Sequence, residues 1–211
     1  MKIKHIIFDM DGTLSDTAKA TYAATTEGAK VHGFPEVDYM EILTAMGLPG
    51  LEFYSRLYPG VSATQLLAIE KQIDDGEERM VKSLGAEILF PEVCEMLEAL
   101  LKDGYSLYIA STGSTRHVHT TLQATGIEKY FSEIHSNRPE KVSMVKEIIA
   151  GRDASEWAMV GDMFKDSDAA RGNGIIAIGA GFGYLAKEDE GLFDYVLKTP
   201  IDIFNVLRLC L

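Results

Sequence analysis

The chain has 211 residues, 46% of them hydrophobic and 25% charged, a composition that is ordinary for a globular protein and gives no sign of disorder. This length is enough for one full domain and a modest insert. The formal net charge of −12 argues against nucleic acid or an anionic membrane surface as a partner. If the substrate is an anion, a cationic group in the site has to offset the surrounding negative charge.

The sequence favours a cytoplasmic location. Cys94 and Cys210 are the only cysteines, and each lies in an apolar helical pattern that is typical of a buried thiol in a reducing compartment. The apolar stretch before Asp9 is too short for a signal peptide, and no apolar run approaches the length of a membrane span. We expect no membrane partner.

The first predicted element is a buried strand over Ile3–Phe8, which ends abruptly at Asp9-Met10-Asp11-Gly12-Thr13. The next segment, residues 15–86, contains helical patterns and no convincing strand. The predicted helices are Asp16–His32, a short helix from Asp38, Leu51–Tyr58, and a long helix from the capping-box sequence Ser62-Ala63-Thr64-Gln65 to Leu84. An all-helical insert therefore follows the first strand.

After residue 86, short apolar runs alternate with amphipathic helices. The predicted strands are Tyr105–Ala110, Glu133–Ser136, Trp157–Val160, Ile175–Ile178 and Tyr195–Leu197. The predicted helices are Pro91–Asp103, Ser114–Thr125 and Glu140–Ala150. This alternation predicts an α/β fold, a doubly wound parallel Rossmann-like sheet with a small all-helical cap domain inserted after the first strand. We assign residues 1–14 and 87–211 to the core and 15–86 to the cap.

Acidic residues follow two of the predicted strands. Asp9 and Asp11 end the first strand, and Asp162 and Asp166 follow Trp157–Val160. Each pair alone is also typical of solvated turn residues or helix caps. In an open α/β sheet, however, ligands bind at the carboxyl ends of the strands, so the carboxylates converge if these two strands are neighbours. Converging carboxylates need a cation, and oxygen ligands suit Mg²⁺ best.

Two other strand ends carry groups suited to an anion. Tyr105–Ala110 leads into Ser111-Thr112-Gly113-Ser114, where hydroxyls and backbone N–H groups precede a predicted helix. An ordinary N-cap explains Ser114 but not Ser111. The segment after Glu133–Ser136 holds two cations, Arg138 and Lys141, within reach of the same point.

Several other patterns are weaker. The glycines of 179–183 have the wrong spacing for a dinucleotide fingerprint, and a loop bordering the site is the better interpretation. His117 and His119 lie two apart on a predicted helix, so they face different directions and make a poor metal pair. In the cap, five residues suit either a pocket wall or the cap core: Tyr22, Met46, Phe53, Tyr54 and Arg56.

Together these motifs resemble the haloacid dehalogenase-like phosphatases over essentially the whole chain. Asp9-Met10-Asp11-Gly12-Thr13 is similar to the first motif of that family, Ile109-Ala110-Ser111 to the second, Lys141 to the third and Gly161-Asp162-x-x-x-Asp166 to the fourth. The acid at Asp11 resembles the phosphatase branch, since dehalogenases lack it. Met46-Gly47-Leu48-Pro49 and Leu89-Phe90-Pro91-Glu92-Val93 resemble phosphatases of the phosphoglycolate phosphatase type.

The resemblance implies a Mg²⁺-dependent phosphatase that hydrolyses a small phosphomonoester, phosphoglycolate or a sugar phosphate, through an aspartyl-phosphate. Asp9 would be the nucleophile and Asp11 the general acid and base. Ser111, Thr112 and Lys141 would bind the phosphoryl group. The metal would be held by Asp9, the backbone carbonyl of Asp11, and Asp162, with support from Asp166.

Some alternatives stay open at this stage. The third-motif cation could be Arg138, which precedes a proline as in many relatives, although we favour Lys141. Asp168 is an alternative to Asp166 as the supporting acid. The motifs do not separate a phosphatase from a phosphomutase of the same fold, and a non-catalytic phospho-acceptor module is a further alternative. We expect a small anionic phosphorylated metabolite as partner, no nucleic acid, and a monomer or weak dimer.

Overall fold

The computed structural model describes residues 3–48 and 50–210, so Pro49 of the cap motif lies outside the described residues. In this part of the chain, six parallel strands form one sheet in the order β3-β2-β1-β4-β5-β6. Their bounds are β1 His5–Phe8, β2 Ser106–Ala110, β3 Glu133–His135, β4 Trp157–Gly161, β5 Ile176–Ala180 and β6 Tyr195–Leu197. The predicted α/β fold class is confirmed.

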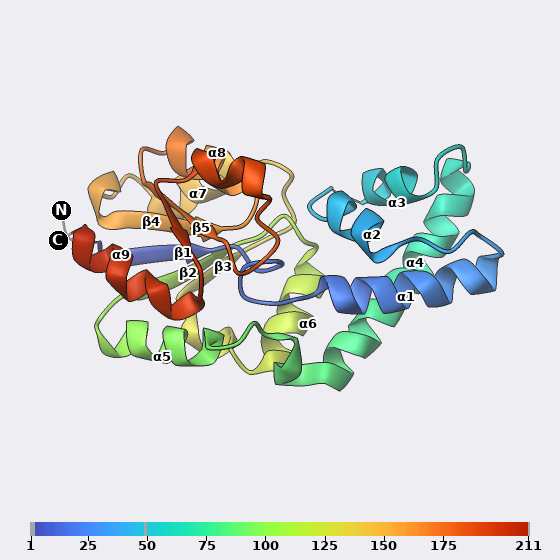
Figure 1. Cartoon of the computed structure of the whole chain (residues 1–211), viewed down its shortest axis with the longest axis horizontal. Coiled ribbons are helices and arrows are strands. Elements are labelled where there is room, and N and C mark those ends of the chain that lie inside the picture. The colour runs from blue at the N-terminus through green and yellow to red at the C-terminus, as the bar shows by residue number, and fades with distance from the viewer. Residues whose placement is uncertain (1–2, 49, 211) are drawn as a thin grey trace.

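Successive residues of β1 pack on opposite faces of the sheet, as the twofold period of a strand requires. Ile6 and Phe8 belong to a core cluster that includes side chains of α5 (Val93–Lys102), α6 (Thr115–Thr125) and α9 (Ile203–Leu209). Ile7 belongs to the cluster formed with α7 (Lys141–Ile149) and α8 (Phe164–Gly172). Figure 1 places α7 and α8 on one side of the sheet and α5 and α9 on the other.

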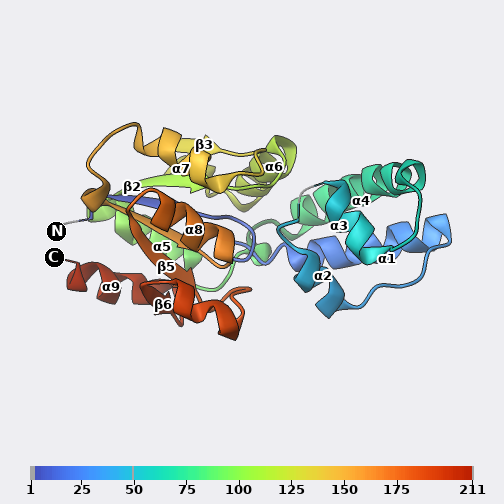
Figure 2. The same cartoon turned by 90° about the horizontal axis from the view of Figure 1, so that it is seen from above.

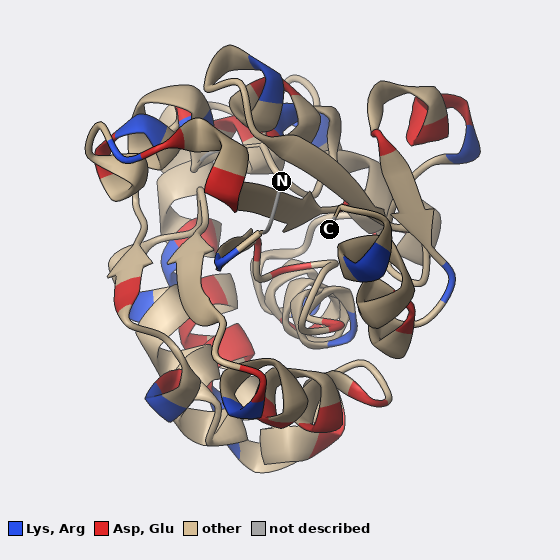
Figure 3. Ribbon diagram, turned by 90° about the vertical axis from the view of Figure 1, so that its left-hand side faces the viewer, with Lys and Arg blue, Asp and Glu red and all other residues tan. Residues whose placement is uncertain are grey.

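The strands carry few charged residues, whereas the helices and loops carry most of them (Figure 3).

The strand order reverses at β1, which lies between β2 and β4. The chain builds β2 and β3 on one side of β1, then returns to build β4, β5 and β6 on the other. The connections that leave β1 and its neighbours therefore diverge and open a crevice at their carboxyl ends. Asp9 and Asp162 both lie at this edge because β1 pairs directly with β4.

Residues after β1 form a layer of helices beyond this edge of the sheet (Figures 1 and 2). The helices are α1 Ala18–His32, α2 Tyr39–Ala45, α3 Leu51–Leu57 and α4 Ala63–Leu84, followed by a 3₁₀ turn, η1 Gly85–Ile88. Small residues let α1 and α4 approach each other closely: a Cβ on Gly76 would lie 3.1 Å from the Cβ of Ala24. These helices have an apolar core of their own. Short 3₁₀ turns in the sheet layer are η2 Glu128–Tyr130, η3 Ala154–Glu156, η4 Lys187–Leu192 and η5 Pro200–Asp202.

The chain passes between the sheet layer and the helical layer twice, and the two passages lie side by side. Ser15 forms isolated bridges with Asp11 and with Leu89. The backbone N–H of Asp16 donates to the Ile88 carbonyl at 2.7 Å. We propose that residues 15–86 act as a cap domain hinged on this paired segment, only a few residues from Asp11.

Two local expectations need correction. Helix α5 begins at Val93, not at Pro91, because Glu92 adopts a left-handed backbone with φ of 69° that no α-helix continues through. The capping box at the start of α4 is only half formed: the Ser62 hydroxyl accepts the N–H of Gln65 at 3.4 Å, but the Gln65 side chain accepts from that hydroxyl and not from the Ser62 backbone.

Candidate active site

The loop after β1 is held against the loop after β4. The N–H of Asp9 donates to the Val160 carbonyl at 2.9 Å, and the Thr13 hydroxyl donates to Asp162 Oδ1 at 2.8 Å. Gly12 has a φ of 81°, and a Cβ there would lie 2.4 Å from Asp162 Oδ2. Only glycine permits both this backbone conformation and this close approach.

Three buried carboxylates meet at this point. Oxygens of Asp9, Asp162 and Asp166 all lie within 4.8 Å of one another. Burial, together with the neighbouring carboxylates, raises the pKa of Asp9 to about 7 and that of Asp162 well above its usual value. Asp162 Oδ2 is buried and has no hydrogen-bond partner among the described atoms. An unpartnered buried oxygen amid repelling carboxylates fits a divalent cation with oxygen ligands.

Asp166 has both oxygens occupied by protein donors. Its Oδ2 accepts the backbone N–H groups of Asp162 and Met163 at 3.1 and 3.0 Å, and its Oδ1 accepts from Lys141 Nζ at 2.6 Å. This carboxylate therefore fixes the loop and the lysine, and Asp162 is left to face the cluster. Asp168 is exposed instead, with Arg171 Nη1 3.7 Å away.

Lys141 is the cation of the cluster. It is the first residue of α7, is 4% exposed, and lies 2.8 Å from Asp9 Oδ1. Burial opposes its charge, but Asp166 and Asp9 outweigh burial and raise the pKa of the lysine. Arg138 lies on the surface, where its guanidinium pairs with Glu147 at 2.6 Å. The structure thus brings Lys141, and not Arg138, to Asp9.

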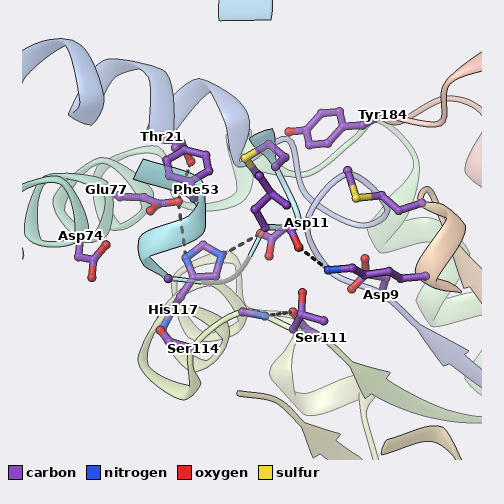
Figure 4. A pocket seen from close by; sticks show the side chains of 18 of the residues that line it. Asp9, Asp11, Thr21, Phe53, Asp74, Glu77, Ser111, Ser114, His117 and Tyr184 are labelled. Atoms are coloured by element: carbon purple, nitrogen blue, oxygen red, sulfur yellow. Dashed lines mark hydrogen bonds and ion pairs between the residues drawn. The ribbon is translucent and has the colours of Figure 1, made fainter. Parts of the chain in front are cut away.

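Asp11 points away from this cluster toward the helical layer (Figure 4). Its Oδ1 accepts from the Thr17 hydroxyl at 2.7 Å and from His117 Nε2 at 2.8 Å. Nδ1 of His117 lies 3.6 Å from Glu77 Oε1 on α4. Burial opposes the imidazolium, but the two carboxylates raise the pKa of His117 to about 10. The pKa of Asp11 is lowered because the His117 charge and hydrogen bonds outweigh its burial.

The end of β2 supplies hydroxyls and backbone donors. Ser111 is buried, and its N–H donates to the His135 carbonyl at 3.0 Å. Its Oγ accepts the N–H of Gly113 at 3.1 Å, and Ser114 caps α6 by accepting the N–H of His117. The N-terminus of α6 is thereby aimed at the crevice, where it favours an anion.

The loop after β5 closes one side of the crevice. A Cβ on Gly183 would lie 1.7 Å from the Gly12 carbonyl oxygen, so the two glycine backbones are in direct contact. The Tyr184 hydroxyl donates to Asp16 Oδ1 and accepts the N–H of Ala18, each at 2.8 Å. The glycine-rich segment therefore borders the site and ties it to the start of α1.

A cavity of about 240 Å³ lies between the crevice and the helical layer. Asp9, Asp11, Ser111, Thr112 and Lys141 line it on the sheet side. Of the five cap residues singled out from the sequence, Met46, Phe53 and Tyr54 line it, whereas Tyr22 and Arg56 are not among its described lining residues. Figure 4 shows His117 between Asp11 and Glu77.

Comparisons with known proteins identify the family of this chain. The sequence matches the family described as haloacid dehalogenase-like hydrolase over residues 6–180. The chain belongs to this family. It is 27% identical to a phosphoglycolate phosphatase from Synechococcus elongatus over 96% of each chain, and 30% identical to a pyrophosphatase from Oceanobacillus iheyensis over 98% of each. A crystal structure of a predicted phosphoglycolate phosphatase from Haemophilus somnus superposes with a TM-score of 0.88 at 22% identity, covering 98% of both chains.

Membership of the haloacid dehalogenase-like hydrolases confirms the resemblance inferred from the motifs and the prediction of a hydrolase. Within the described residues, no helix combines the length and apolarity that a membrane span requires.

His117 is the residue of this hydrolase that sequence reasoning missed. The sequence presents it only as a poor metal ligand, paired with His119. Its position on the first turn of α6, just after the Ser114 cap, was a usable signal, because that turn faces the anion site. Its second partner, Glu77, comes from a distant helix and could not be found without the fold.

Proposed function

We propose that this hydrolase is a Mg²⁺-dependent phosphomonoesterase in which Asp9 is the nucleophile. The observation that carries the proposal is the position of Asp9 at the sheet end of the cavity, 2.8 Å from Lys141 and beside the Asp162 and Asp166 carboxylates. A carboxylate so placed attacks an incoming phosphorus atom, and the cation offsets the repulsion between the two anions.

In the first half-reaction, a carboxylate oxygen of Asp9 forms a bond to phosphorus and the ester P–O bond breaks. The negative charge of the bound phosphoryl group raises the pKa of Asp11, so that Asp11 enters the reaction protonated. It donates this proton to the leaving oxygen, so that an alcohol departs and an aspartyl-phosphate remains. In the second, Asp11 takes a proton from a water molecule, which attacks phosphorus and releases phosphate and free Asp9. His117 holds the Asp11 carboxylate in place between the cavity and the helical layer throughout.

The carboxylates of Asp9 and Asp162 and the main-chain carbonyl of Asp11 would hold Mg²⁺. When bound, the ion neutralises the carboxylates and the phosphoryl oxygens that otherwise repel each other. Asp166 orients both Asp162 and Lys141 through its two occupied oxygens. Ser111 and Thr112 line the cavity beside the amino end of α6, where they would bind the phosphoryl oxygens.

The cavity volume suits a small ester, in keeping with the predicted phosphorylated metabolite. The phosphoglycolate phosphatase from Synechococcus elongatus, similar over nearly the whole chain, supports the same substrate size.

The decisive experiment measures phosphate release from a panel of small phosphomonoesters, with Mg²⁺ and with excess chelator. We expect release only with Mg²⁺, and Asp9→Asn to reduce kcat by at least about 10³-fold while the circular dichroism spectrum is unchanged. Asp168→Asn is the matched control, because it also removes one carboxylate, but from the exposed side of α8 and outside the cluster. Wild-type turnover in Asp9→Asn would refute the mechanism, and isomerisation of a sugar phosphate without release would make the enzyme a mutase.

A further inference from the structure

The cavity has two chemically different ends. The sheet end carries the groups that suit a phosphoryl group. The opposite wall is formed by one face of α4, where Glu70, Asp74 and Glu77 line the cavity. These positions are four and three residues apart, so their side chains project from the same side of the helix. Asp9 lines the same cavity, so the leaving group of a phosphomonoester held there would face this acidic wall.

Two of the three acids of this wall, Glu70 and Asp74, form no ion pair within the described residues, whereas Glu77 faces the His117 imidazolium. Glu77 has Thr21 and His117 as neighbours, whereas Asp74 accepts a hydrogen bond from the neutral Tyr54 hydroxyl at 2.8 Å. The ion pairs that the described residues form on α4 involve its other acids, Asp75 and Glu78 among them, and neither Glu70 nor Asp74. Burial and the nearby Asp74 charge raise the pKa of Glu70. A cation from the ligand would relieve this repulsion.

Aromatic rings complete the same wall. Phe53 and Tyr54 of α3 both line the cavity, and their rings meet edge to face with centroids 5.1 Å apart. An ammonium group is attracted both to carboxylates and to aromatic faces, whereas a carboxylate is repelled by the first and gains nothing from the second. The combination therefore discriminates by charge.

Each cation of the described lining already has a partner in the protein, and His117 lies between Asp11 and Glu77. Lys141 is paired with Asp9 and Asp166 at the sheet end. Lys165 of α8 donates to the Gly47 carbonyl at 2.8 Å, where the α2–α3 loop meets the sheet layer. Lys165 is thus the one described lysine of the lining without a carboxylate partner. An anionic leaving group would bind at Lys165, which is the alternative to an ammonium site on α4.

We propose that the preferred substrate is the phosphate ester of an amino alcohol or amino sugar, with its ammonium group held by Glu70 and Asp74 beside Tyr54. This inference rests on the proposed phosphomonoesterase function and narrows it. It places 2-phosphoglycolate, whose leaving group is anionic, among the poor substrates of this enzyme.

The test compares three esters that differ only at the end of a two-carbon chain: 2-aminoethyl phosphate, 2-hydroxyethyl phosphate and 2-phosphoglycolate. Glucosamine 6-phosphate and glucose 6-phosphate form a second matched pair. In whichever of the two sets is hydrolysed faster, we expect kcat/KM of the amine to be at least about tenfold higher than that of the matching hydroxyl compound. p-Nitrophenyl phosphate reports turnover that does not depend on the amine.

Isosteric variants assign the preference to the wall. Asp74→Asn and Glu70→Gln should each lower the amine-to-hydroxyl ratio of kcat/KM about tenfold, chiefly through KM, and leave p-nitrophenyl phosphate turnover nearly unchanged. Asp75→Asn is the control, because it removes the same charge from the same helix outside the cavity lining. Lys165→Gln should not reduce the use of the amine.

The outcomes separate the two proposals. Hydrolysis of p-nitrophenyl phosphate with no preference for an amine, or with 2-phosphoglycolate preferred and lost in Lys165→Gln, overturns the amine inference and leaves the phosphatase intact. An unchanged amine-to-hydroxyl ratio in both wall variants overturns it as well. Failure to hydrolyse any ester overturns the proposed function and the inference with it.

Discussion

A buried lysine at the first position of a helix is unfavourable by itself, since the helix dipole and the loss of hydration both oppose its charge. Lys141 is stable there because Asp9 and Asp166 lie 2.8 and 2.6 Å from its Nζ. The same two contacts partly neutralise a cluster of carboxylates. Structural stability and the proposed chemistry therefore depend on one ammonium group.

Lys141→Met should lower kcat by at least about 10²-fold, because its charge meets the negative charge of the transition state. The variant should also lose about 3–5 kcal/mol of unfolding free energy in the absence of metal, since buried carboxylates are left unpaired. Phosphate release and urea denaturation measure the two effects. Arg138→Ala, which breaks only the surface pair with Glu147, should change both by little. Equal loss of kcat in the two variants would contradict the assignment.

His117 makes the stability of the protein depend on pH. Its pKa is about 10 in the folded protein against 6.5 as a free side chain. Its stabilising contribution is therefore fully present below about pH 6.5 and is lost as the pH rises through about 10. In chelator, His117→Gln should cost about 1.5–3 kcal/mol at pH 6 and much less at pH 10, as measured by denaturation. His119→Gln, whose partner Glu128 is on the surface, should cost little at either pH.

The contrast between these two residues explains what could be predicted from the sequence. Lys141 was found because it opens a helix near a strand end, and both signals are local. The role of His117 depends on α4, which comes from the insert and meets α6 only in the folded chain. Similarly, Tyr184 contacts Asp16 and Ala18 across more than 160 residues, and no periodicity predicts such a contact.

At the scale of elements, the parallel sheet was predictable because its buried strands are short apolar runs between amphipathic helices. The residues at which the strands and helices begin and end were less predictable. Strands β4 and β5 continue through Gly161 and Ala180, since Gly161 pairs with Gly179 and backbones pair whatever their side chains. Glu92 adopts a left-handed backbone that the sequence pattern does not predict, and α5 therefore starts at Val93 and not at Pro91.

The contact between the loops after β1 and β5 should tolerate no side chain at Gly183. A Cβ there would lie 1.7 Å from the Gly12 carbonyl oxygen, and neither backbone can yield without displacing Asp11 or Tyr184. Gly183→Ala should therefore cost about 1–3 kcal/mol in urea denaturation and lower kcat. Gly191→Ala is the matched control, because nothing lies within 4 Å of its added Cβ, and it should change stability by less than about 0.5 kcal/mol. A neutral Gly183→Ala would contradict the contact.

At the scale of the whole molecule, the net charge is −12, and the negative charges that affect stability most are those of the three buried carboxylates. Burial raises the pKa of Asp9 from 3.8 to about 7. An acid with a raised folded pKa costs the protein nothing below its unfolded pKa, destabilises it progressively as the pH rises from the unfolded to the folded value, and has its full cost above the folded value. Metal-free protein should therefore lose stability between about pH 4 and pH 7.

Mg²⁺ should remove this loss. At a concentration about 100 times its Kd, a ligand of the folded state adds about 2.7 kcal/mol, which is about 5–10 °C in Tm for a chain of this size. The increase should be larger at pH 8 than at pH 5, as measured by thermal denaturation with Mg²⁺ or chelator. Asp162→Asn should raise the Tm in chelator, because it removes repulsion, and abolish the response to Mg²⁺. A lower Tm of this variant in chelator would show that the carboxylates do not repel each other.

The pairing of Ser15 with Leu89 places the two ends of the helical insert side by side, so that the insert can be replaced as one unit. The chain leaves the sheet layer and rejoins it at adjacent points, so the length and sequence of the intervening segment place no demand on the register of the strands. An unrelated insert with closely spaced ends could be grafted between these two residues while β1 still delivers Asp9 to the same position. Selectivity for the alcohol can therefore diverge by exchange of the insert, provided that the new insert keeps the contacts that Thr17 and Glu77 make with Asp11 and His117.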